Sequence, residues 1–197
     1  MSFYNEVIKQ QVLLFLQDYN LLSKLDELHN SIPFSRDVIR VLDVNACDCV
    51  NNKDITFNIA AGVSCSFKCC PEHPEICQNN PLCQQRVKHV FISKLVNQYV
   101  RQKLASSITI QGLEPLDNLI ELLWFLWYLR KQTSDAVFVW TGYTEEEAEW
   151  FIKVIKDLNL DNIFIKFGRF VLNGEPRFDD VLGVVLASSN QYCKKIS

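Results

Sequence analysis

The sequence predicts an α/β fold built on a mostly parallel sheet. Short strand patterns alternate with helical patterns along the second half of the chain. Strands and helices that alternate at this spacing indicate βα units, whose strands lie parallel in one sheet. The chain has 197 residues, of which 48% are apolar and 22% charged, and this is ordinary globular composition. The sequence has no internal repeat, and no linker divides the chain.

Each element is expected from its apolar pattern. Strands are predicted over residues 38–42, 55–60, 107–110, 136–140 and 162–167. Helices are predicted over residues 90–104 and 117–131, and a further helix is expected to begin at Thr144, with three acidic residues in its first turn. Residues 62–81 are rich in Cys, Pro and Asn, and a loop of this length inside a domain usually has a function.

The N-terminal segment differs from the rest of the chain. Residues 3–29 carry apolar positions at helical spacing and predict one helix, or two with a break near Asn20. The predicted organisation is therefore an N-terminal helical extension over residues 1–35 and an α/β domain over residues 36–197. The extension carries no chemical motif, and packing or docking is its expected role.

Charge and targeting patterns argue against several functions. The 20 basic and 23 acidic residues give a net charge of −3, which leaves no basic excess for a phosphate backbone, so nucleic-acid binding is not expected. The apolar run from Val12 to Leu16 is too short for a signal-peptide core, and the run from Leu122 to Leu129 is too short to span a bilayer. We expect a cytoplasmic protein without membrane contact.

The cysteines are unusually clustered. Seven of the eight fall in one segment, and only Cys193 lies elsewhere: Cys47, Cys49, Cys65, Cys69, Cys70, Cys77 and Cys83. Clustered thiols in a cytosolic protein more often bind metal than form disulfides. The chain has no C-x-x-C sequence, which argues against thiol–disulfide exchange. Spacing alone favours a zinc site or an iron–sulfur cluster over reduced core cysteines.

Four sequence blocks follow one another from about residue 55 to the C-terminus. The first is Cys65-x3-Cys69 with Cys77-Gln78-Asn79, and the second is Gln111-Gly112-Leu113-Glu114-Pro115. The third is Thr141-Gly142-Tyr143, and the last joins Gly168-Arg169-Phe170 to Ser188-Ser189-Asn190-Gln191. Together they resemble the radical SAM activating enzymes, in particular the activating proteins of anaerobic ribonucleoside-triphosphate reductase.

Two features depart from the pattern of that family. Seven residues, Cys70 to Ile76, separate the second and third cysteines, where the family usually has two. This leaves Cys70 open as an alternative to Cys69, and Cys83 as an alternative to Cys77. In the second block, Leu113 interrupts a Gly-Gly-Glu-Pro-like sequence, and Gln111 stands in place of a glycine.

The resemblance implies a partial (β/α)6-type radical SAM barrel whose site lies at the C-terminal ends of its strands. It implies that Cys65, Cys69 and Cys77 hold a [4Fe–4S] cluster with one iron left free for S-adenosylmethionine (SAM). One electron would then cleave the sulfonium C–S bond and release a 5′-deoxyadenosyl radical, so no catalytic side chain is expected beyond the cluster. The backbone from Gln111 to Glu114 would receive the amino end of SAM, and Ile76 would lie against adenine. The full set of implied cofactor-binding residues is Ile76, Gln111, Gly112, Leu113, Glu114, Ser189 and Asn190.

The function implied by the resemblance is activation of a glycyl-radical enzyme by hydrogen abstraction from a glycine. The expected partners are an anaerobic ribonucleotide reductase and a flavodoxin- or ferredoxin-type electron donor. Two alternatives remain open. One is radical SAM modification of another protein or peptide, which the long cysteine loop favours. The other is a non-catalytic metal-binding module of the same fold, which Leu113 favours.

Overall fold

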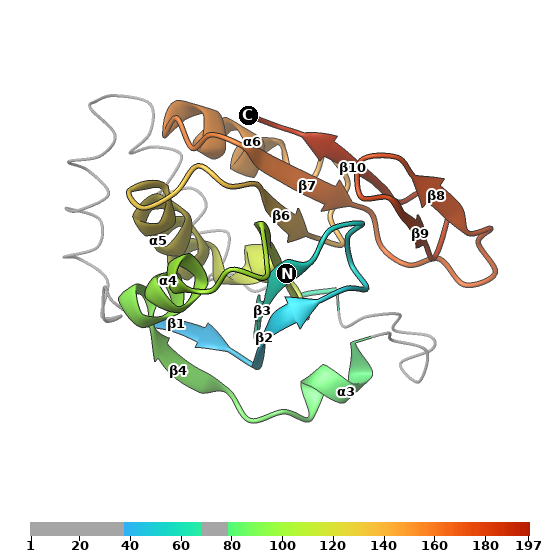
Figure 1. Cartoon of the computed structure of the whole chain (residues 1–197). Helices are drawn as coiled ribbons and strands as arrows, with labels where there is room; N and C mark the ends of the chain where they lie inside the picture. The colour runs from blue at the N-terminus through green and yellow to red at the C-terminus, as the bar shows by residue number, and fades with distance from the viewer. Residues whose placement is uncertain (1–37, 68–78) are drawn as a thin grey trace.

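Six strands form the central sheet, in the order β10-β7-β6-β5-β3-β2 (Figure 1). The computed structural model describes residues 38–67 and 79–197, so the predicted N-terminal extension lies outside the described residues. Four neighbouring strands of this sheet are parallel: β3 (Thr56–Gly62), β5 (Ser107–Gly112), β6 (Val137–Trp140) and β7 (Ile163–Phe167). The predicted α/β fold with a mostly parallel sheet is confirmed.

The parallel strands succeed one another across the sheet in chain order, without a reversal. They are connected by three helices: α4 (Ile92–Arg101), α5 (Leu119–Arg130) and α6 (Glu149–Asp157). Because parallel crossovers are right-handed, an order that never reverses places all three helices on the same side of the sheet. Figure 1 shows them together on that side, while the arrowheads of β6 and β7 point toward the β8–β9 hairpin.

Antiparallel strands form both edges of this sheet. β2 (Asp43–Asp48) pairs with β3, and β10 (Tyr192–Lys195) pairs with β7. The sequence pattern predicted neither strand, since β2 is largely polar and β10 has only four residues. In the described part of the chain these two edges do not meet, so the sheet is open and is not a closed barrel.

Two small antiparallel sheets lie beside the central one. β1 (Val38–Val41) pairs with β4 (Lys88–Phe91), and β8 (Arg177–Asp179) pairs with β9 (Val184–Leu186). The pairing of β4 corrects one prediction: the helix expected from residue 90 begins at Ile92, because residues 88–91 are held as a strand by β1. A short helix, α3 (Asn80–Cys83), begins at the end of the region that was expected to be a loop, residues 62–81.

Two helix starts also differ from the prediction. The helix expected over residues 117–131 is a 3-10 turn, η2 (Pro115–Asn118), followed by α5. Thr144 and Glu147 form reciprocal hydrogen bonds, in which Thr144 N donates to Glu147 Oε2 over 2.9 Å and Glu147 N donates to Thr144 Oγ1 over 3.2 Å. This is the geometry of a capping box. The turn that it closes leads into α6, which begins at Glu149.

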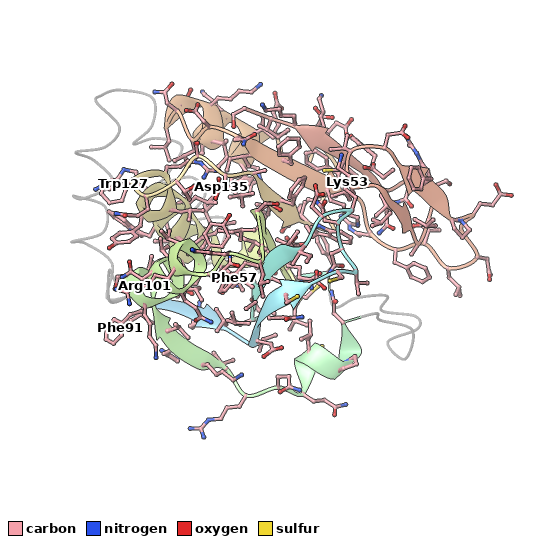
Figure 2. The ribbon with its side chains drawn as sticks, in the orientation of Figure 1. Lys53, Phe57, Phe91, Arg101, Trp127 and Asp135 are labelled. Atoms are coloured by element: carbon pink, nitrogen blue, oxygen red, sulfur yellow. The ribbon has the colours of Figure 1, made fainter. Side chains whose placement is uncertain are left out.

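The two faces of the parallel strands bury different side chains. On the helix side, alternate positions are apolar and form the main core, with Phe57, Ile110 and Val139 as examples. Phe57 lies at the centre of the molecule in Figure 2, whereas Phe91, 58% exposed, lies at its edge. The opposite face carries polar residues such as Thr109 and Lys166, both buried. The candidate site lies on this polar side of the sheet, where Lys166 is one of its lining residues.

Candidate functional site

A cavity of about 870 Å³ opens at the C-terminal ends of the parallel strands. Residues that directly follow or end β3, β5, β6 and β7 line it, among them Cys65, Gly112, Thr141 and Gly168. Residues of β9 form another wall. A volume of this size falls within the range of cofactor pockets in proteins. The location agrees with the prediction that the site lies where the parallel strands end.

Cys65, the first of the three predicted cluster ligands, lies in the cavity wall just after β3. The next residue is tied down by Asp117 of η2. Ser66 N donates to Asp117 Oδ2 over 2.5 Å, and Ser66 Oγ donates to Asp117 Oδ1 over 3.0 Å. The Tyr143 hydroxyl also donates to Asp117 Oδ1, over 3.2 Å. Asp117 therefore fixes the backbone next to the Cys65 thiol.

Phe67 connects this segment to two of the other sequence blocks. Its ring lies edge-on to Tyr143, with centroids 4.4 Å apart, and the Arg169 guanidinium carbon lies 4.0 Å from its centroid. Arg169 in turn donates two hydrogen bonds from Nη2 to the Glu147 carboxylate, over 2.6 and 2.8 Å. Gly142 leaves room for this arrangement, because a Cβ there would lie 3.2 Å from the Phe67 ring.

The predicted SAM-binding segment, Gln111 to Glu114, lies in the same cavity wall. Its glycine is required by a backbone contact with β3. Gly112 has φ +135°, and a Cβ there would lie 2.6 Å from the Gly62 nitrogen. A side chain on Gly62 would likewise lie 2.5 Å from the Glu114 nitrogen. The two glycines thus let two parallel strand ends approach closely, and Leu113 N donates to Gly62 O over 2.8 Å.

Glu114 is 1% exposed and lies at the base of the cavity. Its carboxylate accepts hydrogen bonds from Leu116 N, Thr141 Oγ1 and Gly142 N, over 3.0, 2.7 and 2.8 Å. Burial raises the pKa of Glu114 to about 8, against the opposing effect of these donors. The Glu114 side chain therefore connects the second sequence block to the third, and Glu114 is also one of the residues that line the cavity.

Two polar residues at strand ends, Trp140 and Lys166, also line the cavity, although neither was among the predicted site residues. Trp140 and Lys166 are register partners at the ends of β6 and β7. The Trp140 Nε1 atom is buried and has no hydrogen-bond partner in the described structure. Lys166 is 5% exposed, and burial lowers its pKa to about 8. Strand alternation was the available signal, because Lys166 faces away from the apolar positions Ile165 and Phe167.

The second half of the last sequence block, residues 188–191, reaches the cavity through Gln191. Gln191 is buried, lines the cavity and donates from Nε2 to Gly168 O over 3.2 Å. Ser189 and Asn190, which were predicted to bind the cofactor, are exposed and do not line the cavity. Asn190 instead donates from Nδ2 to Arg169 O over 2.8 Å, and its carbonyl lies 2.8 Å from where a Cβ of Gly168 would be. Asn190 and Gln191 therefore hold the turn that follows β7.

The other two predicted cluster ligands lie in the part of the chain that the structure does not describe. Cys69, Cys77 and Ile76 lie outside the described residues, and so does Cys70. Among the residues that the structure describes, no three His, Cys, Asp or Glu side chains converge on a metal-sized site. Cys47, Cys49 and Cys83 are exposed, and Cys193 is buried, which raises the pKa of its thiol to about 12. The two described residues that flank the gap, Phe67 and Asn79, both line the cavity.

The family model of the 4Fe-4S single cluster domain matches residues 59–191, which is more than half of the chain. The chain belongs to this family. The match begins within β3 and ends at Gln191, so it spans all of the parallel strand ends that form the cavity. No curated protein and no solved structure matches the chain.

The described residues fit the cluster that defines the family. Cysteine thiolates are the usual ligands of a [4Fe–4S] cluster, and Cys65 is one of the residues that line the cavity. An iron–sulfur domain is compatible with redox or radical chemistry. Nowhere in residues 38–67 and 79–197 is there a helix that is both long and apolar enough to cross a membrane.

Proposed function

We propose that the chain is a SAM-dependent radical generator that activates a glycyl-radical enzyme, with a partial barrel of the radical SAM type as its fold. The observation that carries this proposal is the convergence of distant sequence blocks on one cavity. Cys65, the segment from Gln111 to Glu114, Thr141-Gly142, Gly168-Arg169 and Gln191 all contribute to its wall. The family match supplies the second support, since it indicates a single [4Fe–4S] cluster.

Cys65, Cys69 and Cys77 are the proposed cluster ligands. Cys69 follows Phe67 by two residues and Cys77 precedes Asn79 by two, and both flanking residues line the cavity. Since two residues span at most about 7 Å of chain, the chain length on either side of the gap is compatible with both cysteines as ligands at the cavity. Three thiolates leave one iron of such a cluster free for an external ligand.

The residues of this chain would bind and orient the cofactor. A reduced cluster held by these cysteines would supply the one electron needed to split SAM at a sulfonium C–S bond into methionine and a 5′-deoxyadenosyl radical. The backbone from Gln111 to Glu114 would accept hydrogen bonds from the amino group of SAM, and the support for this role is that the segment lies in the cavity wall, where Gly62 and Gly112 let the strand ends approach closely. The buried surroundings of Glu114 and Thr141 would limit water at the base of the site.

The decisive experiment is anaerobic reconstitution followed by reduction with dithionite in the presence of SAM. We expect about four iron and four sulfide per chain, and formation of 5′-deoxyadenosine and methionine. Cys65→Ser should lose iron and SAM cleavage, while the exposed Cys47→Ser serves as the matched control. A cluster that forms without SAM cleavage would contradict the proposal.

The partner is proposed to be a glycyl-radical enzyme, such as an anaerobic ribonucleotide reductase, with a flavodoxin or ferredoxin as electron donor. Electron paramagnetic resonance of a mixture with such an enzyme should show a glycyl radical. If SAM is cleaved and the captured partner is another protein that becomes modified, the alternative of protein or peptide modification holds instead.

A non-catalytic metal-binding module is the second candidate. The observation that favours it is Leu113, which interrupts the Gly-Gly-Glu-Pro-like sequence and lies in the cavity wall. Zinc without iron or sulfide in the purified protein would support this candidate and would defeat the radical generator.

A further inference from the structure

Cys47 and Cys49 are two neighbouring thiols that the proposed cluster does not use. Cys47 lies in β2, which is an edge strand of the central sheet, and Cys49 directly follows that strand. Both cysteines are exposed, whereas Asp48 between them is only 6% exposed. Because successive side chains of an extended chain point to opposite faces, the two thiols lie on the same, outward side.

The local backbone and the side chains bring these two thiols together. The pairing register of β2 with β3 shifts between Asn45 and Asp48, and Cys47 N donates to Asn45 Oδ1 over 3.0 Å. The side chains of Cys47 and Cys49 are hydrogen-bonded to each other. Desolvation, and then the charge and the hydrogen bond of Cys47, raise the pKa of the Cys49 thiol. The two sulfur atoms are therefore direct neighbours.

Asp48 anchors the pair from the inner side. Its Oδ2 atom accepts hydrogen bonds from Asn51 Nδ2 over 2.7 Å and from Asn58 Nδ2 over 3.2 Å. Val50 and Asn51, the residues that follow Cys49, line the cavity. The thiol pair is thus joined to the cavity wall by a short stretch of chain and one buried carboxylate.

Packing does not account for two exposed cysteines side by side. Cysteine is among the residues most often fully buried, yet neither of these two belongs to an apolar cluster of the described residues. The chain lacks the C-x-x-C spacing of exchange enzymes, so the pair is better suited to being modified than to catalysing exchange. A disulfide requires Cα atoms no more than about 7 Å apart, and a separation of two residues meets that limit.

We propose that Cys47 and Cys49 form a reversible redox site, which closes to an internal disulfide by exchange with a small disulfide such as oxidised glutathione. The thiolate of one cysteine attacks a glutathione sulfur, breaks the glutathione S–S bond and releases one glutathione. The thiolate of the other cysteine attacks the resulting mixed disulfide, forms the internal S–S bond and releases the second glutathione. The two cysteines together lose two electrons and two protons, which end on the two glutathione thiols.

The site is expected to be reversible, because exposed disulfides are generally the labile ones. An excess of a reducing thiol should therefore open the bond again. Closure would constrain the backbone directly before Val50 and Asn51, so that the oxidation state of the pair acts next to the cavity wall.

The test is peptide mapping of the full chain after equilibration with mixtures of reduced and oxidised glutathione. Samples are quenched with acid, alkylated and digested with trypsin. Cleavage after Arg40 and Lys53 isolates a peptide of residues 41–53, in which Cys47 and Cys49 are the only cysteines. In more oxidising mixtures this peptide should lose both alkylation sites together and become lighter by two hydrogen atoms. Dithiothreitol should restore both sites.

The mixed disulfide distinguishes a pair from two independent thiols. Less than about a tenth of the parent peptide should carry glutathione, because the neighbouring thiol displaces it. Cys47→Ser and Cys49→Ser each leave one thiol, so their peptide should carry about 10-fold more glutathione than the parent peptide. Cys83→Ser removes an exposed cysteine elsewhere in the chain and is the matched control, with a peptide that behaves like that of the parent protein.

Three results would overturn the inference. The peptide could keep both alkylation sites in the most oxidising mixture, carry glutathione on both cysteines, or be joined to a cysteine outside residues 41–53. The measurement requires neither SAM cleavage nor a partner protein, so its outcome is independent of the proposed function.

Discussion

The side-chain amide of Asn79 donates a 2.6 Å hydrogen bond to the main-chain carbonyl of Gly112. This contact joins the residue that ends the cysteine-rich loop to the end of β5, 33 positions away. At the other end of that loop, Ser66 is held by Asp117. Both anchors bind to the segment that leads from β5 into α5. The cysteine loop and the proposed SAM-binding backbone are therefore positioned by the same short stretch of chain.

Asn79→Ala removes this anchor. We expect the reconstituted variant to retain less iron and to lose its cluster faster on exposure to a chelator, because the end of the loop is no longer held at Gly112. The free energy of unfolding should fall by only about 1 kcal/mol, the usual contribution of one hydrogen bond. Iron analysis and urea denaturation measure the two effects. Asn97→Ala, on the exposed face of α4, is the control, and equal iron loss in both variants would contradict the prediction.

Asp117→Asn tests the opposite anchor. The carboxylate accepts from the Ser66 backbone, the Ser66 hydroxyl and the Tyr143 hydroxyl, and an amide cannot accept at both of its terminal atoms. The expected loss of stability is about 1–3 kcal/mol, measured by thermal or urea unfolding. The cluster content after reconstitution should fall as well.

The control for this substitution is Asp180→Asn, an exposed aspartate in the loop between β8 and β9. It should unfold like the parent protein. Normal stability and normal iron content in Asp117→Asn would mean that the contacts of Ser66 do not hold the loop.

Gly112→Ala should be strongly destabilising. Its φ of +135° is unfavourable for any side chain, and the added Cβ would lie 2.6 Å from a backbone atom of Gly62, which cannot move aside. We expect a loss of about 2 kcal/mol or more in the free energy of unfolding. Gly142→Ala is the comparison, since its nearest neighbours are ring and side-chain atoms at 3.2 to 3.3 Å. A smaller loss in Gly112→Ala than in Gly142→Ala would refute this account.

Glu114 should make stability depend on pH. Its pKa is raised from 4.5 to about 8, so between these values the folded protein holds a proton that the unfolded chain releases. Its contribution to stability is therefore complete below about pH 4.5 and is lost as the pH rises through about 8. In Glu114→Gln this dependence is absent, so the unfolding free energy of the parent protein minus that of the variant should decrease steadily as the pH rises from 5 to 8.

Urea denaturation at several pH values measures this difference. Glu149→Gln, an exposed position at the start of α6, should show a difference from the parent protein that does not vary over the same range. A constant difference for Glu114→Gln would show that the carboxyl group does not hold an extra proton in the folded protein.

Local sequence patterns predicted the parallel core well, for a physical reason. Buried parallel strands are nearly continuous apolar runs, and residues 107–110 and 136–140 have this pattern. The edge strands lack it. β2 is exposed at alternate positions, and its pairing with β3 is set by tertiary contacts rather than by its own composition. For the same reason residues 90–91 of β4 were assigned to a helix, since it is the pairing with β1 that holds residues 88–91 as a strand.

The sequence blocks were expected to meet at one site, and Cys65 and the segment from Gln111 to Glu114 do line one cavity. That these residues bind a cluster or SAM stays a prediction. Lys166 and Asp117 were missed, because their roles depend on neighbours that are distant in the sequence. In the last block, the resemblance pointed to Ser189 and Asn190, but the turn after Ser188 directs the next buried polar side chain, Gln191, toward the cavity.

The position of Trp140 gives this protein a built-in optical reporter. The chain has four tryptophans, and of these Trp140 borders the cavity, while Trp124 and Trp127 lie on α5 and Trp150 on α6. An iron–sulfur chromophore assembled next to the indole of Trp140 would quench its emission by energy transfer. Fluorescence of a variant that keeps only this tryptophan would therefore follow filling of the cavity in real time, without labelling.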